Sequence, residues 1–194
     1  MNLDRAFLAV PVPEQVCQAV AELQSQLASR TTNLRWVRPD SLHLTLHFFG
    51  RVAEENLEKI KASMLSVGLR TEPFQVDIRG LGVFPNSRRP RVLWLGLEPE
   101  EPLMALSAAW QEALSPTGLP PGDRPFSPHL TIGRFRQRGN RPDTLLSGQG
   151  DHPLIGTLPV DRLVLYESRL TPRRAEHRPV HSVSLGAGPS LNTG

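Results

Sequence analysis

Two short segments of the sequence place a threonine two positions after a histidine. His43 and Thr45 flank a leucine in the first segment, and His129 and Thr131 flank a leucine in the second. In an extended strand residues i and i+2 share a face, so each segment predicts an imidazole beside a hydroxyl on a rigid support. Hydrolysis of a phosphate ester needs a base for the attacking water and an acid for the leaving oxygen, and histidine can serve as either near neutral pH. The threonine hydroxyls could donate to the non-bridging oxygens as negative charge builds there.

The two segments occur in matching contexts, and this repetition is the informative signal. A proline precedes each histidine, Pro39 in the first copy and Pro128 in the second, and an aliphatic residue follows each threonine. A single His-x-Thr tripeptide is common and is more often structural. Two copies in different halves of the chain suggest two similar lobes that face each other.

The elements that must position these residues alternate between strands and helices. Apolar residues at helical spacing predict helices over about 14–28, 53–66 and 101–114. Alternating or continuous apolar runs predict strands over 7–10, 35–37, 41–49, 74–83, 92–97, 129–135, 162–166 and 180–185. In the 41–49 strand, strict alternation places His43, Thr45 and His47 on one face and Phe48 on the other, with the leucines. We expect one domain over residues 1–185 and a mobile tail over 186–194 that is rich in glycine, proline and serine.

Composition narrows the class of protein. The chain has 194 residues, of which 39% are hydrophobic and 21% charged, as in an ordinary globular domain. The apolar run at residues 7–10 is too short for a membrane span or a signal peptide, and a single cysteine, Cys17, cannot form an internal disulfide. We therefore expect a cytoplasmic protein with no membrane partner. Most basic residues are arginines, which suits a phosphate-bearing substrate but would also follow from a GC-rich genome.

The paired segments at His43 and His129 resemble the signature of the 2H phosphoesterase superfamily, and within it the RNA 2',3'-cyclic phosphodiesterases, also called 2'-5' RNA ligases. The resemblance extends well beyond the two motifs. Similar family segments occur at residues 7–10, 35–39, 48–50, 80–85, 88–94 and 163–168, so it covers about residues 2–185.

The resemblance implies a bilobal α+β fold in which two antiparallel sheets flank a central cleft, with the helices outside. It also implies that His43 is the proton donor to the leaving 3'-oxygen and that His129 is the proton acceptor that activates water. Thr45 and Thr131 would complete the catalytic site, and the product would be a 2'-phosphate. With an RNA 5'-hydroxyl in place of water, the same site would form a 2'-5' linkage.

Arg134 matches the basic residue that follows the second motif in the family, where it helps to hold the phosphate. Strict alternation would place Arg134 on the opposite face from His129 and Thr131, and a bulge at Gly133 would restore its direction. A phosphate contact and a solvated edge charge both stay open.

Other residues give weaker signals. Arg88, Arg89 and Arg91 form a basic turn that could follow an RNA backbone or could simply be solvated. Phe84 could stack on a base, although a role in the core is the more common one. The remaining histidines, His152, His177 and His181, receive only structural or surface interpretations.

The sequence indicates no metal and no cofactor. His47 would lie about 13 Å from His43 at about 3.3 Å per residue, which is too far for both to bind one ion, and no cysteine or carboxylate cluster has the spacing of a metal site.

The expected partner is RNA with a 2',3'-cyclic phosphate end, with tRNA fragments among the candidates, bound by a monomer. One alternative is a catalytically silent RNA- or nucleotide-binding module. Another is a phosphodiesterase that acts on small cyclic nucleotides or on ADP-ribose cyclic phosphate.

Overall fold

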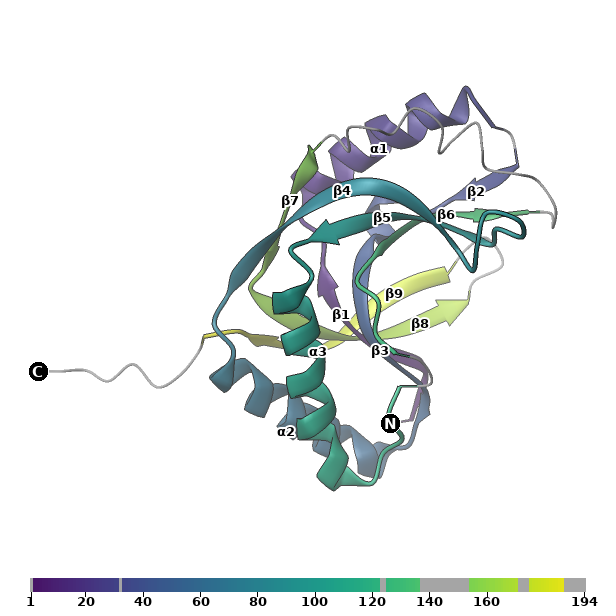
Figure 1. Ribbon diagram of the computed structural model, residues 1–194. Helices are drawn as coiled ribbons and strands as arrows, with labels where there is room; N and C mark the ends of the chain where they lie inside the picture. The colour runs from purple at the N-terminus through teal and green to yellow at the C-terminus, as the bar shows by residue number, and fades with distance from the viewer. Residues whose placement is uncertain (1, 32, 123–124, 137–153, 171–174, 187–194) are drawn as a thin grey trace, which may run out of the picture.

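Two antiparallel sheets carry the two histidine segments, one segment in each sheet. The computed structural model describes residues 2–31, 33–122, 125–136, 154–170 and 175–186. In these ranges the strands are β1 (Leu3–Pro11), β2 (Leu34–Trp36), β3 (His43–Val52), β4 (Phe74–Phe84), β5 (Val92–Glu98), β6 (Leu130–Phe135), β7 (Leu154–Val160), β8 (Arg162–Leu170) and β9 (Ala175–Ser184). They form a four-stranded sheet, β3-β1-β8-β9, and a five-stranded sheet, β2-β6-β5-β4-β7 (Figure 1). The α+β prediction with two antiparallel sheets is confirmed.

The helices follow the apolar periodicity of the sequence. Helices α1 (Glu14–Ala28) and α3 (Glu101–Leu114) begin and end where the pattern predicts. Helix α2 (Glu54–Arg70) continues one turn beyond its predicted end, because Val67 is fully buried and Gly68 lies tightly against β9. Figure 1 shows α2 and α3 side by side at one end of the molecule, while α1 packs against β7 in the five-stranded sheet.

Strand β7 is the element that the sequence pattern missed. Its seven residues include Gly156 and Pro159, which weaken any strand signal. Among the described strands, β7 lies at the edge of its sheet and pairs with β4 alone, where Pro159 is opposite Gln75. An edge strand tolerates proline because one row of its N–H groups has no partner strand to bond.

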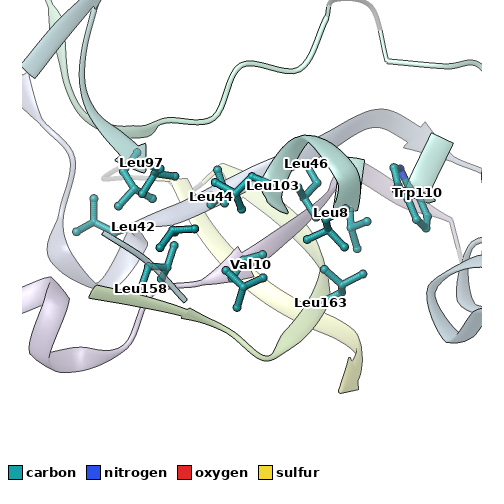
Figure 2. Close-up of a cluster of buried hydrophobic side chains, with 14 of the residues drawn as sticks. Leu8, Val10, Leu42, Leu44, Leu46, Leu97, Leu103, Trp110, Leu158 and Leu163 are labelled. Carbon is teal, nitrogen blue, oxygen red and sulfur yellow. The ribbon is translucent and has the colours of Figure 1, made fainter. Parts of the chain in front are cut away.

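One hydrophobic core joins the two sheets and the helices. Figure 2 shows leucine side chains from β1, β3 and β8 of one sheet meeting those from β5 and β7 of the other. Helix α3 adds Leu103 and Trp110, and both are fully buried. The side chain of Leu44, between His43 and Thr45, is also fully buried in this cluster, so the core fixes the strand that carries the first motif.

The predicted internal repeat has a structural counterpart. The order β1–α1–β3, with the short β2 inserted before β3, recurs as β5–α3–β6, and in both halves the first and last strands pair antiparallel. Each histidine segment therefore lies at the start of the strand that ends such a unit. The expected tail falls, from residue 187 onward, outside the described residues, and so does His152. Among the helices that the structure describes, none has the length and apolar character needed to cross a membrane.

Leu44 provides a test of how the core supports the motif. We expect Leu44→Ala to lower the free energy of unfolding by about 2–5 kcal/mol, the usual cost of deleting a buried leucine side chain. The matched control is Leu65→Ala on α2, where the leucine is 51% exposed, and a surface substitution should change stability by less than about 0.5 kcal/mol. Urea denaturation measures both, and equal losses would contradict the assignment of Leu44 to the core.

Candidate active site

The two motif histidines meet where the sheets approach each other. His43 is the first residue of β3, and His129 directly precedes β6, which begins at Leu130 and so one residue later than predicted. Strands β3 and β6 belong to different sheets and lie next to each other. The two imidazoles are close enough for charge on His129 to lower the pKa of His43. We call the side of the sheets that carries both histidines the catalytic face.

Each imidazole is held by a carbonyl oxygen two residues earlier in the chain. Nδ1 of His43 lies 2.8 Å from the carbonyl oxygen of Ser41, and Nδ1 of His129 lies 2.7 Å from that of Ser127. A carbonyl oxygen can only accept a hydrogen bond, so Nδ1 carries the hydrogen in both rings. Each neutral ring therefore leaves Nε2 as the nitrogen that can take a proton, and each protonated ring can donate it from the same atom.

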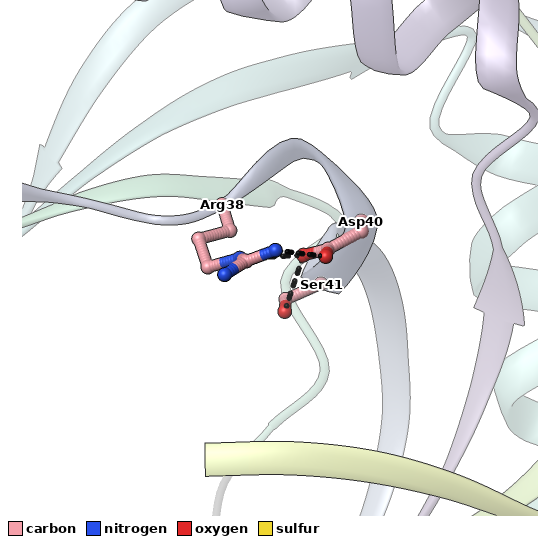
Figure 3. A network of polar contacts seen from close by, with 3 residues as sticks. All are labelled: Arg38, Asp40 and Ser41. Carbon is pink, nitrogen blue, oxygen red and sulfur yellow. Dashed lines mark hydrogen bonds and ion pairs between the residues drawn. The ribbon is translucent and has the colours of Figure 1, made fainter. Parts of the chain in front are cut away.

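A polar network shapes the turn that supplies the Ser41 carbonyl. A 3₁₀ turn over Pro39–Ser41 leads into β3. Figure 3 shows the guanidinium of Arg38 bonded to both carboxylate oxygens of Asp40, while the Ser41 hydroxyl donates to Oδ1 of Asp40 over 3.1 Å. The ion pair is more than half exposed, so its own contribution to stability is small, roughly 0–1 kcal/mol. Its bonds orient the residue that holds His43.

Aromatic rings enclose both imidazoles. The His43 ring centroid lies 4.7 Å from that of Phe7 and 5.0 Å from that of His177, which meets His43 edge to face. The His129 ring contacts Phe84 edge to face at 4.9 Å. Phe84 therefore contacts a motif histidine, and whether it also stacks on a base is untested. His177, which received only a structural or surface interpretation from the sequence, contacts the first motif histidine.

This burial lowers the pKa of both motif histidines. The pKa of His43 falls from 6.5 to about 4, because burial disfavours the charged ring and because His177, Arg134 and His129 add positive charge nearby. Burial also lowers the pKa of His129, and the charge of Arg134 adds to the effect. In both rings the hydrogen bond from Nδ1 opposes the shift. Both shifts therefore favour the neutral imidazoles in the free protein near pH 7.

A bulge interrupts β6 directly after its motif. Two consecutive β5 residues pair with Gly133 and Thr131, which are two positions apart, so Ile132 is an extra residue. Ile132 and Gly133 are both buried, so both lie on the core side of the sheet. Such an insertion reverses the alternation of every residue that follows it.

The bulge turns Arg134 to the catalytic face. Trp94 pairs with Thr131 and Val92 pairs with Arg134, and because Val92 and Trp94 are two apart in β5 they share a face. Arg134 therefore lies on the same face as Thr131, and the positive charge of Arg134 lowers the pKa of both motif histidines. The bulge predicted at Gly133 is present, while a phosphate contact by Arg134 is still a proposal.

A buried glutamine holds this bulge in place. Nε2 of Gln24, on α1, donates to the carbonyl oxygens of Ile132 (2.9 Å) and Val37 (2.7 Å). The backbone N–H of Val37 also donates to Ile132, over 2.9 Å. The carbonyl of the extra residue thus has two donors, and the bulge is tied to the helix behind the sheet.

A bulge at the equivalent position of β3 corrects the predicted facing of two residues. Leu8 pairs with His47 and the next β1 residue pairs with Thr45, so Leu46 is the extra residue. His47 consequently faces the core, where it contacts Phe49, and it does not share a face with His43. Phe48 turns to the catalytic side and is 66% exposed.

A glycine makes room for the aromatic support of His129. Trp94 lies across Gly82 on the neighbouring strand, and a Cβ built at Gly82 would come within 2.1 Å of the indole. The indole contacts Phe84 at 5.1 Å and His129 at 6.4 Å between ring centroids. A side chain at position 82 would therefore displace the ring beneath His129.

Several residues of this site were missed from the sequence. Ser41 and Ser127 stand at the same offset before the two histidines, so a longer reading of the repeat, Ser-x-His-x-Thr, would have found them. Gln24 and His177 have no comparable local signal, because pairing of distant segments brings them to the site. Among the residues that the structure describes, no group of three or more His, Cys, Asp or Glu side chains could hold a metal ion.

Comparisons with known proteins agree with this geometry. The family model for LigT-like phosphoesterases matches residues 10–94. A crystal structure from Thermus thermophilus superposes with a TM-score of 0.79 at 30% identity, covering 95% of this chain and 99% of that one. The structure of E. coli LigT complexed with 3'-AMP has a TM-score of 0.71 at 26% identity, covering 94% and 98%. The fold and the paired motifs thus define a LigT-like phosphoesterase of the 2H superfamily.

The names of similar proteins narrow the class of phosphoesterase further. The RNA 2',3'-cyclic phosphodiesterase of Methanothermobacter thermautotrophicus is 39% identical over 170 residues, which is 87% of this chain and 91% of that protein. The enzyme of the same name from Thermotoga maritima is 33% identical over 95% of this chain and 97% of that protein. The chain belongs to this RNA 2',3'-cyclic phosphodiesterase family.

The rings around His43 lead to a prediction about its pKa. We expect His177→Ala to raise the pKa of His43 from about 4 toward 6.5, because the substitution admits water to the imidazole and removes a nearby positive charge. NMR titration of the His43 ring in the free protein measures this value.

The control is His181→Ala, on the same strand. The pKa of His181 responds to Lys61 and Glu58 of α2, so this ring lies toward the helix and not toward His43. The pKa of His43 should be unchanged in this variant. An unchanged His43 pKa in His177→Ala would show that His177 does not shield it.

Proposed function

We propose that this protein hydrolyses RNA 2',3'-cyclic phosphate ends to 2'-phosphate ends by acid–base catalysis between two histidines. The observation that carries the proposal is the pair of Nδ1 hydrogen bonds to the carbonyls of Ser41 and Ser127. These bonds leave two Nε2 atoms, one from each sheet, as the groups that can accept or donate a proton. The names of the relatives support the choice of substrate.

In the proposed reaction each histidine moves one proton. Nε2 of His129 accepts a proton from water as the water oxygen attacks phosphorus. The bond between phosphorus and the 3'-oxygen breaks, and Nε2 of His43 donates its proton to that oxygen. The phosphate stays on the 2'-oxygen. The hydroxyls of Thr45 and Thr131 and the guanidinium of Arg134 would stabilise the non-bridging oxygens as negative charge develops.

The lowered pKa values set a condition for this reaction. The acid must be protonated and the base neutral, yet His43 carries the larger lowering and is neutral in the free protein near pH 7. A cyclic phosphodiester brings one negative charge to the site, and an opposite charge nearby raises a histidine pKa. Binding of the substrate would therefore promote protonation of the group that acts as the acid.

The same chemistry with a different nucleophile accounts for the proposed ligation. If an RNA 5'-hydroxyl replaces water, its oxygen attacks phosphorus of the cyclic phosphate as His129 accepts its proton. The bond between phosphorus and the 3'-oxygen breaks, His43 donates a proton to that oxygen, and a 2'-5' linkage forms. Water outcompetes this nucleophile in dilute solution, so hydrolysis should dominate. We further propose that the protein acts as a cytoplasmic monomer, without a metal or cofactor, and that tRNA fragments are among its substrates.

The proposed roles predict how single substitutions affect turnover. His43→Ala and His129→Ala should each lower the rate by about a hundredfold or more, the usual scale for losing a general acid or base. Thr45→Ala and Thr131→Ala should each cost on the order of tenfold, because each removes one hydrogen bond to a charged oxygen. Hydrolysis of RNA with a 2',3'-cyclic phosphate end, with identification of the phosphate position in the product, measures both effects.

The same assay in EDTA tests metal independence, since activity should survive chelation. Loss of activity in EDTA and its return with a divalent ion would overturn the two-histidine mechanism.

Near-full activity of either histidine variant would remove that residue from the proposed mechanism. Wild-type protein that binds RNA without hydrolysing it would instead identify a silent binding module.

The assignment of acid and base leads to a separate prediction. Because burial lowers both histidine pKa values, we expect the bell-shaped profile of kcat/KM, which reports the free protein, to peak below about pH 6.5. The profile belongs to the coupled pair and does not say which histidine is which.

A substrate with a better 3' leaving group distinguishes the two histidines. Its leaving oxygen needs little protonation, so it should rescue His43→Ala and leave His129→Ala unrepaired. The opposite pattern would exchange the two roles, and rescue of both variants would mean that neither role is correct.

A further inference from the structure

Two arginines stand directly opposite each other beside the motif of β6. Arg35 of β2 pairs with Arg134 of β6, and both are exposed. Cross-strand partners project from the same face, and Arg134 lies on the catalytic face because of the bulge at Ile132. The neighbours of Arg35 in β2, Leu34 and Trp36, pack toward the core, in agreement with an outward direction for Arg35.

This arrangement has an energetic cost that nothing in the described part of the chain relieves. Like charges directly opposite each other destabilise an antiparallel pair. In the ranges that the structure covers, neither Arg35 nor Arg134 has an ion pair or a side-chain hydrogen bond. Two guanidinium groups held together in this way favour an anion between or above them.

The sheet is also polarised along its length. Asp77 and Glu98 form a cross-strand pair at the far end of β5, six positions from Val92 and so roughly 20 Å away, and Arg79 forms an ion pair with Asp77 there over 3.1 Å. At the arginine end, the backbone of Arg91 bonds to Phe135 and the backbone of Arg136 bonds to Asn33, so further arginines are anchored close by. Positive charge therefore continues from the catalytic face toward β2 and declines along β5.

We propose that Arg35 forms a second phosphate subsite, which binds the phosphodiester on the 5' side of the terminal nucleotide of an RNA chain, beside the cyclic phosphate that Arg134 contacts. This inference rests on the proposed function and extends it. It predicts that an oligonucleotide with a cyclic phosphate end is a better substrate than a cyclic mononucleotide, which has no such phosphate. It thereby favours RNA over the small cyclic nucleotides left open by the sequence.

The test compares two substrates with two variants. The substrates are 2',3'-cyclic AMP and an oligoadenylate that ends in a 2',3'-cyclic phosphate. Arg35→Gln should lower kcat/KM for the oligonucleotide by about tenfold, the effect of losing one charged phosphate contact, and should leave the mononucleotide within about twofold of wild type. The slope of log kcat/KM against log salt for the oligonucleotide should fall by about 0.7.

Arg35→Lys and Arg70→Gln serve as controls. The lysine keeps the charge, so it should retain most of the oligonucleotide preference. Arg70 lies at the end of α2, where its Nε donates to the carbonyl of Ser66, and its loss removes the same charge away from the sheet. This variant should match wild type on both substrates. Equal losses on both substrates in Arg35→Gln, or no loss on either, would overturn the subsite.

A binding measurement separates this inference from the proposed function. An oligoadenylate ending in a 2'-phosphate is inert, and its affinity can be compared with that of adenosine 2'-monophosphate. A tighter oligonucleotide complex that Arg35→Gln weakens would support the subsite even if wild-type protein hydrolysed neither substrate. Equal affinities in wild type and Arg35→Gln would reject the subsite, whatever the activity.

Discussion

The hydrogen bond from each motif imidazole to the carbonyl two residues earlier is the interaction on which the geometry of the site depends. The carbonyls of Ser41 and Ser127 can only accept, so they fix the hydrogen on Nδ1 of His43 and His129 and turn Nε2 outward. These bonds also oppose the effect of burial on the two pKa values. Because the carbonyls belong to the segments that lead into the strands, their positions follow from the backbone. The local chain thus sets the tautomer, the orientation and part of the acidity of each ring.

The second constraint is the bulge after each motif, which decides which side chains join the histidines. The bulge at Ile132 adds Arg134 to the face of Thr131, and Gln24 satisfies the carbonyl that the bulge exposes. An unpaired buried carbonyl would be costly, and both the amide of Gln24 and the backbone N–H of Val37 donate to the carbonyl of Ile132. Gln24 on α1 and Arg134 on β6 are thus linked through the bulge at Ile132: the first donates to its carbonyl, and the second faces the histidines because of it.

The sequence predicted what depends on neighbours along the chain and missed what depends on pairing between distant strands. Period-two alternation placed His43 beside Thr45, and helical periodicity located α1 and α3 to the residue. The facing of His47 and Phe48 was wrong, because the bulge before them is defined by the register with β1. Strand β7 was missed because its glycine and proline hide the pattern. The contact of His177 with His43 depends on the strand order of the four-stranded sheet, β3-β1-β8-β9, which no local sequence pattern encodes.

The equivalent bulges in β3 and β6 bring different chemistry to matching places. Five residues after each histidine, the catalytic side receives Phe48 in one half and Arg134 in the other. The two strands that follow the histidines therefore share a bulge at the same offset, while the side chains that the bulge turns to the catalytic side differ. A phosphodiester has two non-equivalent ends, and a symmetric site would accept it in either sense. An aromatic ring on one side and a cation on the other make the two senses unequal, so under the proposed function the site would distinguish the two directions of an RNA chain.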